Sequence, residues 1–249
     1  MDISHIDYVL PDELIAQTPI EPRDSARLLV DAADEIEHRQ VSDIVEYLRA
    51  GDVLVVNHTR VLPARLKLKR RTGGAVEVLL LEERDADQMQ WEALVRPGGK
   101  LSLGEELIDG TGDVMLRIGE RTQAGDTFFV QFVARTHEEA MQKIMDTGEM
   151  PLPPYITTAL ADQSRYQTVF AHDQKSSAAP TAGLHFTPEL LARIREAGVE
   201  ICEVELVVGL DTFKPISVEN PLDHVIHTES YRVPADTIDA CKRARESGG

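Results

Sequence analysis

The sequence has 249 residues, with 43 acidic residues against 26 Lys and Arg, so its formal net charge is −17. It is 42% hydrophobic and 28% charged, which is typical of a folded globular protein and excludes wholesale disorder. No apolar run reaches the ~18 residues of a membrane-spanning helix, and two cysteines are too few for a disulfide scaffold. With an acidic N-terminal stretch that predicts no secretory signal, we expect a cytoplasmic protein that binds no membrane.

The first part of the chain predicts an α/β layer. Residues 27–30 and 52–57 are apolar enough for two strands of that layer, the second buried on both faces. Between them, residues 42–51 have apolar side chains at helical spacing. Ser42 is the expected N-cap of this helix, and Gly51 is expected to end it.

The next part predicts strands without intervening helices, separated by glycine-rich turns. This pattern is typical of a small barrel or sandwich. The expected strands are residues 61–68, 75–82, 89–95, 113–118 and 127–134.

Helices return after the strands. Thr136 and Glu139 have capping-box spacing at the start of one helix, and Thr187 precedes another that ends at Gly198. Residues 201–210 predict a strand and 235–247 a helix. The expected fold class is α/β: an α/β domain, residues 1–61 and 150–249, is interrupted by an inserted small β-barrel domain, residues 62–149, with a trailing helix. Because the chain stops where the α/β period requires another strand, we interpret it as C-terminally incomplete.

A basic strip, residues 60–71, contains six basic residues and no acid. On a strand, alternation places Arg65, Lys67 and Lys69 outward while Leu66 and Leu68 face a core. The strip is therefore either a solvated face or a surface that binds the phosphates of a polyanion. The expected phosphate contacts are Lys67, Lys69, Arg70 and Arg71.

Three other segments contain side chains suited to chemistry. The small residues of 178–187 allow a close backbone approach to a ligand before a helix, and His185 is either a general base or a packed loop residue. Tyr155, in a proline-rich connector, offers a ring for stacking or for a cation. His224 and His227 would point to opposite faces of a strand, which disfavours a metal site formed by the two. A metal hydrolase remains an alternative function, and an acid–base role for these histidines is equally open.

Taken in order along the chain, these and other blocks resemble the S-adenosylmethionine:tRNA ribosyltransferase-isomerase family of queuosine biosynthesis. The resemblance covers essentially the whole sequence and implies the layout described above, an α/β domain with an inserted β-barrel. The blocks are LIAQ (14–17) with Arg23 and Arg27, NHTRVLPARL (57–66), MPLPPYI (150–156), YQTVF (166–170), AAPTAGLHF (178–186), TFKP (212–215) and HVIHTE (224–229).

The resemblance implies transfer and isomerisation of the ribosyl group of S-adenosylmethionine onto 7-aminomethyl-7-deazaguanine in tRNA. Epoxyqueuosine is formed, and adenine and methionine are released. The implied cosubstrate is S-adenosylmethionine, no metal is expected, and we expect a monomer.

Site residues follow from the same resemblance. Because a sulfonium acidifies the adjacent ribose methylene, a base is needed there, and His185 and His227 are the candidates. Tyr155 or Glu229 is expected to stabilise the positive charge of the sulfonium. Residues expected to bind substrate or cosubstrate are Arg23, Arg27, Asn57, Arg60, Arg65, Tyr155, Thr181, Gly183 and His224.

The chain departs from the family pattern at two positions. Val207 stands where the family has His, and Asp211 stands where it has Gly. Family members also continue into Thr-Thr-Ser-x-Arg and Asn-Phe-His-Leu-Pro blocks, which supports the incomplete reading. An alternative function of another class is a noncatalytic RNA-binding module that uses the basic strip of the β-domain.

Overall fold

The computed structural model describes residues 8–31, 35–123, 125, 127–209, 218, 220–223 and 228–249. The chain divides into two compact units. Unit 1 is Met1–Arg60, Pro153–Asp173 and Ala179–Gly249, and unit 2 is Val61–Leu152 and Gln174–Ala178. Compactness does not test independent folding, so the domain division expected from the sequence stays a prediction.

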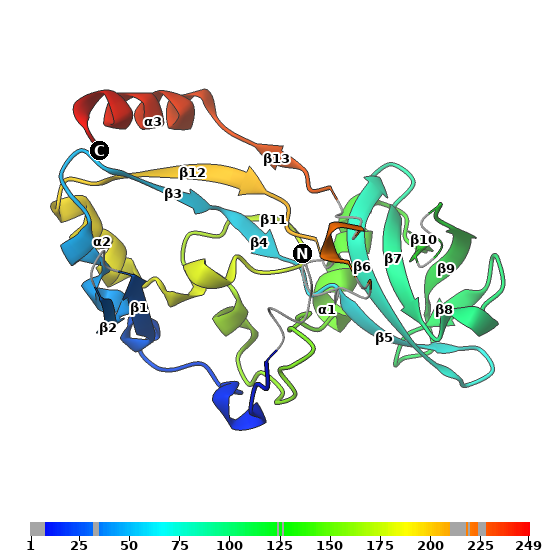
Figure 1. Cartoon of the computed structure of the whole chain (residues 1–249). Coiled ribbons are helices and arrows are strands. Elements are labelled where there is room, and N and C mark those ends of the chain that lie inside the picture. The colour runs from blue at the N-terminus through cyan, green and yellow to red at the C-terminus, as the bar shows by residue number, and fades with distance from the viewer. Residues whose placement is uncertain are drawn as a thin grey trace. The chain divides into compact units, whose positions relative to one another are not determined.

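Unit 2 contains a closed β-barrel, as expected (Figure 1). Around the barrel the strand order is β10-β7-β6-β5-β8-β9, with each neighbouring pair antiparallel. Leucine, valine and aromatic side chains at alternate positions fill its interior, including Leu66, Val78 and Trp91. The strands are β5 (Arg65–Arg70), β6 (Ala75–Asp85), β7 (Gln90–Arg96), β8 (Glu106–Ile108), β9 (Val114–Arg121) and β10 (Thr127–Phe132).

Helix α1 (His137–Thr147) follows the barrel and buries Ala140 and Ile144 in the same core. Thr136 caps it by accepting a hydrogen bond from the backbone N–H of Glu139 at 3.2 Å, as the capping-box spacing predicts. The expected strand 61–68 is divided into β4 (Thr59–Val61) and β5, because the intervening Pro63 has no N–H for a strand ladder. β4 pairs with β11 (Asp173–Ser176) in a separate small sheet.

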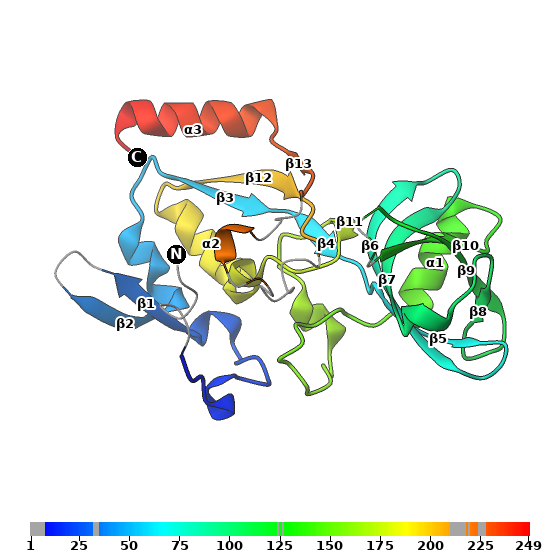
Figure 2. The same ribbon diagram turned by 45° about the vertical axis from the view of Figure 1, so that its right-hand side comes forward.

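Unit 1 contains the expected α/β layer. Strands β3 (Val53–Asn57) and β12 (Glu200–Leu206) are parallel, and β13 (Tyr231–Arg232) adds antiparallel to β12. Helices α2 (Pro188–Glu196) and α3 (Ala235–Ser247) lie on opposite faces of this sheet (Figures 1 and 2). These helices cover the sheet only in part, because Val56 is the one buried residue of β3 and Val55 is 43% exposed, so the prediction that this strand is buried on both faces is wrong.

Two further predictions for unit 1 are wrong. β1 (Arg27–Asp31) does not join the sheet of β3 but pairs with β2 (Ile36–Gln40). The sequence of β2 is mostly charged and polar, so this strand was not predicted. The expected helix at residues 42–51 is a 3-10 helix, η4 (Val41–Tyr47), and Ser42 is not its cap. Instead Asp43 accepts a hydrogen bond from the backbone of Gln40 at 2.9 Å.

The remaining short 3-10 helices lie between these elements. They are η2 (Asp12–Leu14), η3 (Arg23–Ser25), η5 (Gly98–Lys100), η6 (Gln163–Tyr166), η7 (Thr181–His185) and η9 (Pro221–Asp223). Within the described part of the chain, every helix is too short or too polar to span a bilayer.

Candidate active site

Gln17 holds the connector that carries Tyr155. Its side-chain amide donates to the carbonyl of Tyr155 at 3.0 Å and accepts from the backbone N–H of Thr157 at 2.8 Å. These bonds fix the backbone on both sides of Ile156, while 54% of the Tyr155 residue stays exposed. The exposed ring is therefore presented from an anchored backbone.

Arg23, which is expected to bind substrate, instead donates hydrogen bonds to three backbone carbonyls of the protein. Its guanidinium donates to the carbonyl of Gln167 at 2.6 Å, of Ser164 at 3.1 Å and of Leu184 at 3.3 Å. Partial burial is the main cause that lowers the pKa of Arg23, although an arginine stays protonated in proteins. These bonds join the segment around Ser164 to the loop that precedes α2, so Arg23 is a positioning residue in this structure.

The loop containing Thr181, Gly183 and His185 forms η7, directly before α2. A Cβ at Gly183 would lie 2.9 Å from the ring of Phe170 and 2.9 Å from Thr168, so packing requires the glycine. His185 Nδ1 lies 3.1 Å from the carbonyl of Ala182. Because a carbonyl only accepts, the proton is on Nδ1 and the Nε2 lone pair remains for a base.

Asn57 and Glu229 support the backbone at the ends of strands. Asn57 donates to the carbonyl of Leu206 at 2.8 Å and accepts from its N–H at 3.1 Å, which ties β3 to β12. Glu229 accepts from the backbone N–H of Gly209 at 2.7 Å. The Asn57 amide is thus committed to local structure, whereas Glu229 holds the backbone of Gly209 through one oxygen of its carboxylate.

For several of the expected site residues, the contacts that the structure describes do not link one to another. Arg27, Arg60 and Thr181 are exposed. His224, His227, Asp211 and residues 212–215 lie outside the described residues. Their roles stay predictions.

The basic strip alternates as predicted, with Leu66 and Leu68 buried and Lys67 and Lys69 exposed. Its charge, however, is largely matched by acids distant in the sequence. Within the described part of the chain, Arg60 and Lys69 are the members without an acidic partner. The pairs are Lys67 with Glu149 at 2.7 Å, Arg70 with Glu105 at 2.5 Å, Arg71 with Glu106 at 2.8 Å and Arg65 with Glu77 at 3.6 Å.

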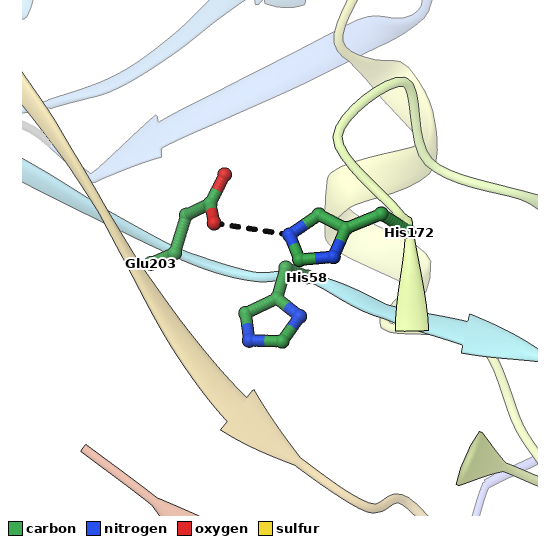
Figure 3. Close-up of side chains that lie close together, drawn as sticks. All are labelled: His58, His172 and Glu203. Atoms are coloured by element: carbon green, nitrogen blue, oxygen red, sulfur yellow. Dashed lines mark hydrogen bonds and ion pairs between the residues drawn. The ribbon is translucent and has the colours of Figure 1, made fainter. Parts of the chain in front are cut away.

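The structure also assembles a cluster to which the sequence analysis assigned no role (Figure 3). The rings of His58 and His172 are stacked, with centroids 4.3 Å apart and planes 3° apart. His172 Nε2 lies 3.1 Å from a carboxylate oxygen of Glu203, and its Nδ1 lies 3.2 Å from Asp173. Hydrogen bonds to Glu203 and then Asp173 raise the pKa of His172 above its ordinary value.

No spacing in the sequence links these side chains. His58 directly follows β3, and Glu203 lies within β12. Ligands of α/β sheets commonly bind beyond the carboxyl ends of parallel strands, so the position of His58 after a predicted buried strand is the signal that could have identified it.

Known proteins resemble the chain over its whole length. A family model described as "Queuosine biosynthesis protein" matches residues 3–249. S-adenosylmethionine:tRNA ribosyltransferase-isomerases from Symbiobacterium thermophilum and Desulfitobacterium hafniense are 49% and 46% identical to it, over 254 and 252 residues. Each alignment covers 100% of this chain and 72% of the relative.

A solved structure is also similar. It is the crystal structure of S-adenosylmethionine tRNA ribosyltransferase from Thermotoga maritima, which is 34% identical, with a TM-score of 0.40. The match covers 98% of this chain and 66% of that one, so the chain spans about two thirds of its length. On the match to the family model over residues 3–249 and the identity to the curated relatives, the chain belongs to the queuosine biosynthesis protein family.

Proposed function

We propose that the chain transfers and isomerises the ribosyl group of S-adenosylmethionine onto 7-aminomethyl-7-deazaguanine in tRNA. Epoxyqueuosine is the product in the tRNA, and adenine and methionine leave. The observation that carries this proposal is 46–49% identity, over the whole chain, to relatives named S-adenosylmethionine:tRNA ribosyltransferase-isomerase. A noncatalytic RNA-binding module is not favoured, because these relatives are named as enzymes.

His185 is the base that the geometry supports best. Its Nδ1 is engaged by Ala182, which orients the ring and leaves Nε2 to take a proton from the ribose methylene next to the sulfonium. The C–H electron pair stays on carbon as the proton moves to Nε2. His227 remains a second candidate base, and the Tyr155 ring and Glu229 are proposed to stabilise the sulfonium.

The tRNA contacts are proposed for the basic strip. Arg60 and Lys69 are exposed and have no acidic partner among the described residues, so their charge is available to phosphates. We propose a monomeric enzyme that acts in the cytoplasm, with tRNA and S-adenosylmethionine as its partners.

The test is adenine release. The purified chain is incubated with S-adenosylmethionine and tRNA carrying the precursor base, and adenine and the modified nucleoside are measured by liquid chromatography. We expect both products in equal amounts, and none when either substrate is omitted. The relative from Symbiobacterium thermophilum is the positive control. The proposal would be rejected if that relative releases adenine while this chain binds the tRNA but releases none.

A further inference from the structure

We propose that His58, His172 and Glu203 bind a divalent transition-metal ion of the zinc class, with Asp173 and Glu205 as neighbouring oxygen donors. Within the described residues, two groups of side chains place one donor atom each within 4.8 Å of the others: His58 with His172 and Glu203, and His58 with Asp173 and Glu205. His58 is the residue that the two groups share. This inference is independent of the proposed enzymatic function.

The donor set selects the class of ion. Two imidazole nitrogens with carboxylate oxygens suit Zn²⁺, Co²⁺ and Ni²⁺, whereas Mg²⁺ and Ca²⁺ prefer oxygen donors alone. His172 has a carboxylate beside each ring nitrogen, since its Nε2 lies 3.1 Å from Glu203 and its Nδ1 lies 3.2 Å from Asp173, and only one of these nitrogens can bind the ion. Ligand atoms about 2.1 Å from one tetrahedral ion are about 3.4 Å apart, so the His172 Nε2 and Glu203 atoms must move apart slightly, and the nitrogen lone pair must turn from the carboxylate to the ion.

His58 supplies a second, independent observation. Only 8% of the residue is exposed, and among the residues that the structure describes its buried Nδ1 has no hydrogen-bond partner. The carboxylate of Asp173 lies 3.9 Å from this nitrogen, which is beyond hydrogen-bond distance. A buried polar atom normally has a partner, and an ion beside the cluster would give Nδ1 one.

The stacking of the two imidazole rings determines which side chain must move when an ion binds. In-plane lone pairs of parallel rings run side by side and do not converge on one ion. His58 is held in the interior, whereas the His172 and Glu203 side chains are 55% and 46% exposed and have room to change rotamer once the hydrogen bond between them breaks. Binding therefore requires His172 to leave the stacked arrangement that Figure 3 draws, while the buried ring stays in place.

The test uses metal alone and needs no substrate. All proteins carry Cys241→Ser, because Cys241 is a partly exposed free thiol that would compete for the ion. Co²⁺ binding is followed by visible absorption, and Zn²⁺ binding is followed by calorimetry and by the rise in Tm. We expect one ion per chain with nitrogen and oxygen ligation.

The variants are His172→Ala and Glu203→Gln, chosen because both side chains are exposed. Each is expected to weaken binding at least about tenfold, since even groups that only support a ligand change affinity by 10–100-fold. The matched control is His137→Ala, which removes a His–carboxylate pair, 2.7 Å to Glu83, in unit 2. Its affinity should equal that of the parent.

Three results overturn the proposal. They are no stoichiometric binding by the parent, binding that both variants retain, and binding that disappears in the His137→Ala control. Retention by both variants would place the ion elsewhere, including at His224 or His227. Far-UV circular dichroism of each variant shows whether a loss of binding is accompanied by a loss of fold.

Discussion

The imidazole of His172 lies flat on that of His58, with the ring centroids 4.3 Å apart. The two residues are also joined through their backbones, because the N–H of His172 donates to the carbonyl of His58 at 2.9 Å. One ring is buried and the other is half-exposed between two carboxylates. The end of β3 is thus joined to the segment before β11 by ring and backbone together, which gives the cluster a rigid inner member and an adjustable outer one.

Gly183→Ala should destabilise unit 1. The new Cβ would lie 2.9 Å from both Phe170 and Thr168, so side chains or backbone must shift, at a cost of about 1–3 kcal/mol. Urea unfolding measures the change. Gly99→Ala is the matched control, because nothing lies within 4 Å of the Cβ position there. Equal effects of the two substitutions would contradict the packing role of Gly183.

Arg23→Lys should reduce stability although it keeps the charge. A lysine ammonium cannot reproduce the forked bonds to Gln167, Ser164 and Leu184, and a carbonyl left without its partner costs about 1–3 kcal/mol. Thermal unfolding is the measurement, with Arg27→Lys on the exposed neighbour as control. If Arg23 instead contacts cosubstrate, the KM for S-adenosylmethionine rises and the Tm does not change.

The Arg70–Glu105 pair should make unit 2 more stable at neutral than at acid pH. The hydrogen bond from Arg70 is the largest cause that holds the pKa of Glu105 below its ordinary 4.5. A carboxyl with a lowered pKa in the folded state stabilises above 4.5, and this contribution is lost as the pH falls through the lowered value.

Glu105→Gln tests this dependence on pH. Its Tm should lie below that of the parent at pH 7, and the two curves should converge in acid, below the ordinary carboxyl range. Glu120→Gln, on an exposed side chain, should follow the parent throughout. A constant difference between Glu105→Gln and the parent at every pH would contradict the ionic origin of the effect.

Lys69→Gln should weaken tRNA binding more than Lys67→Gln. The Lys67 ammonium lies 2.7 Å from Glu149, so part of its charge is already matched, whereas Lys69 has no acidic partner among the described residues. Loss of a phosphate contact should lower the slope of log affinity against log salt by about one. Filter binding over a salt series measures both quantities. Identical slopes for the two variants would remove the distinction between paired and unpaired cations.

Much of the fold could be predicted from the sequence because its signals are local. Alternation at Leu66 and Leu68 predicts one barrel strand by itself, since side chains of a strand point to opposite faces in turn. The caps at Thr136 and Thr187 likewise depend on residues three positions away. β8 is three residues long, too short to show a period, and was not predicted.

The tertiary structure decided which distant residues meet. Arg23 becomes a clamp because loops more than a hundred residues later bring their carbonyls to it, and acids outside the strip neutralise much of its charge. His58, His172 and Glu203 have no common period, because their proximity arises from strand pairing and chain return. Sequence alone thus determined the longer strands and helices and the family resemblance, which depend on short-range order. The partners of individual charges and imidazoles depend on long-range packing, and only the folded chain shows them.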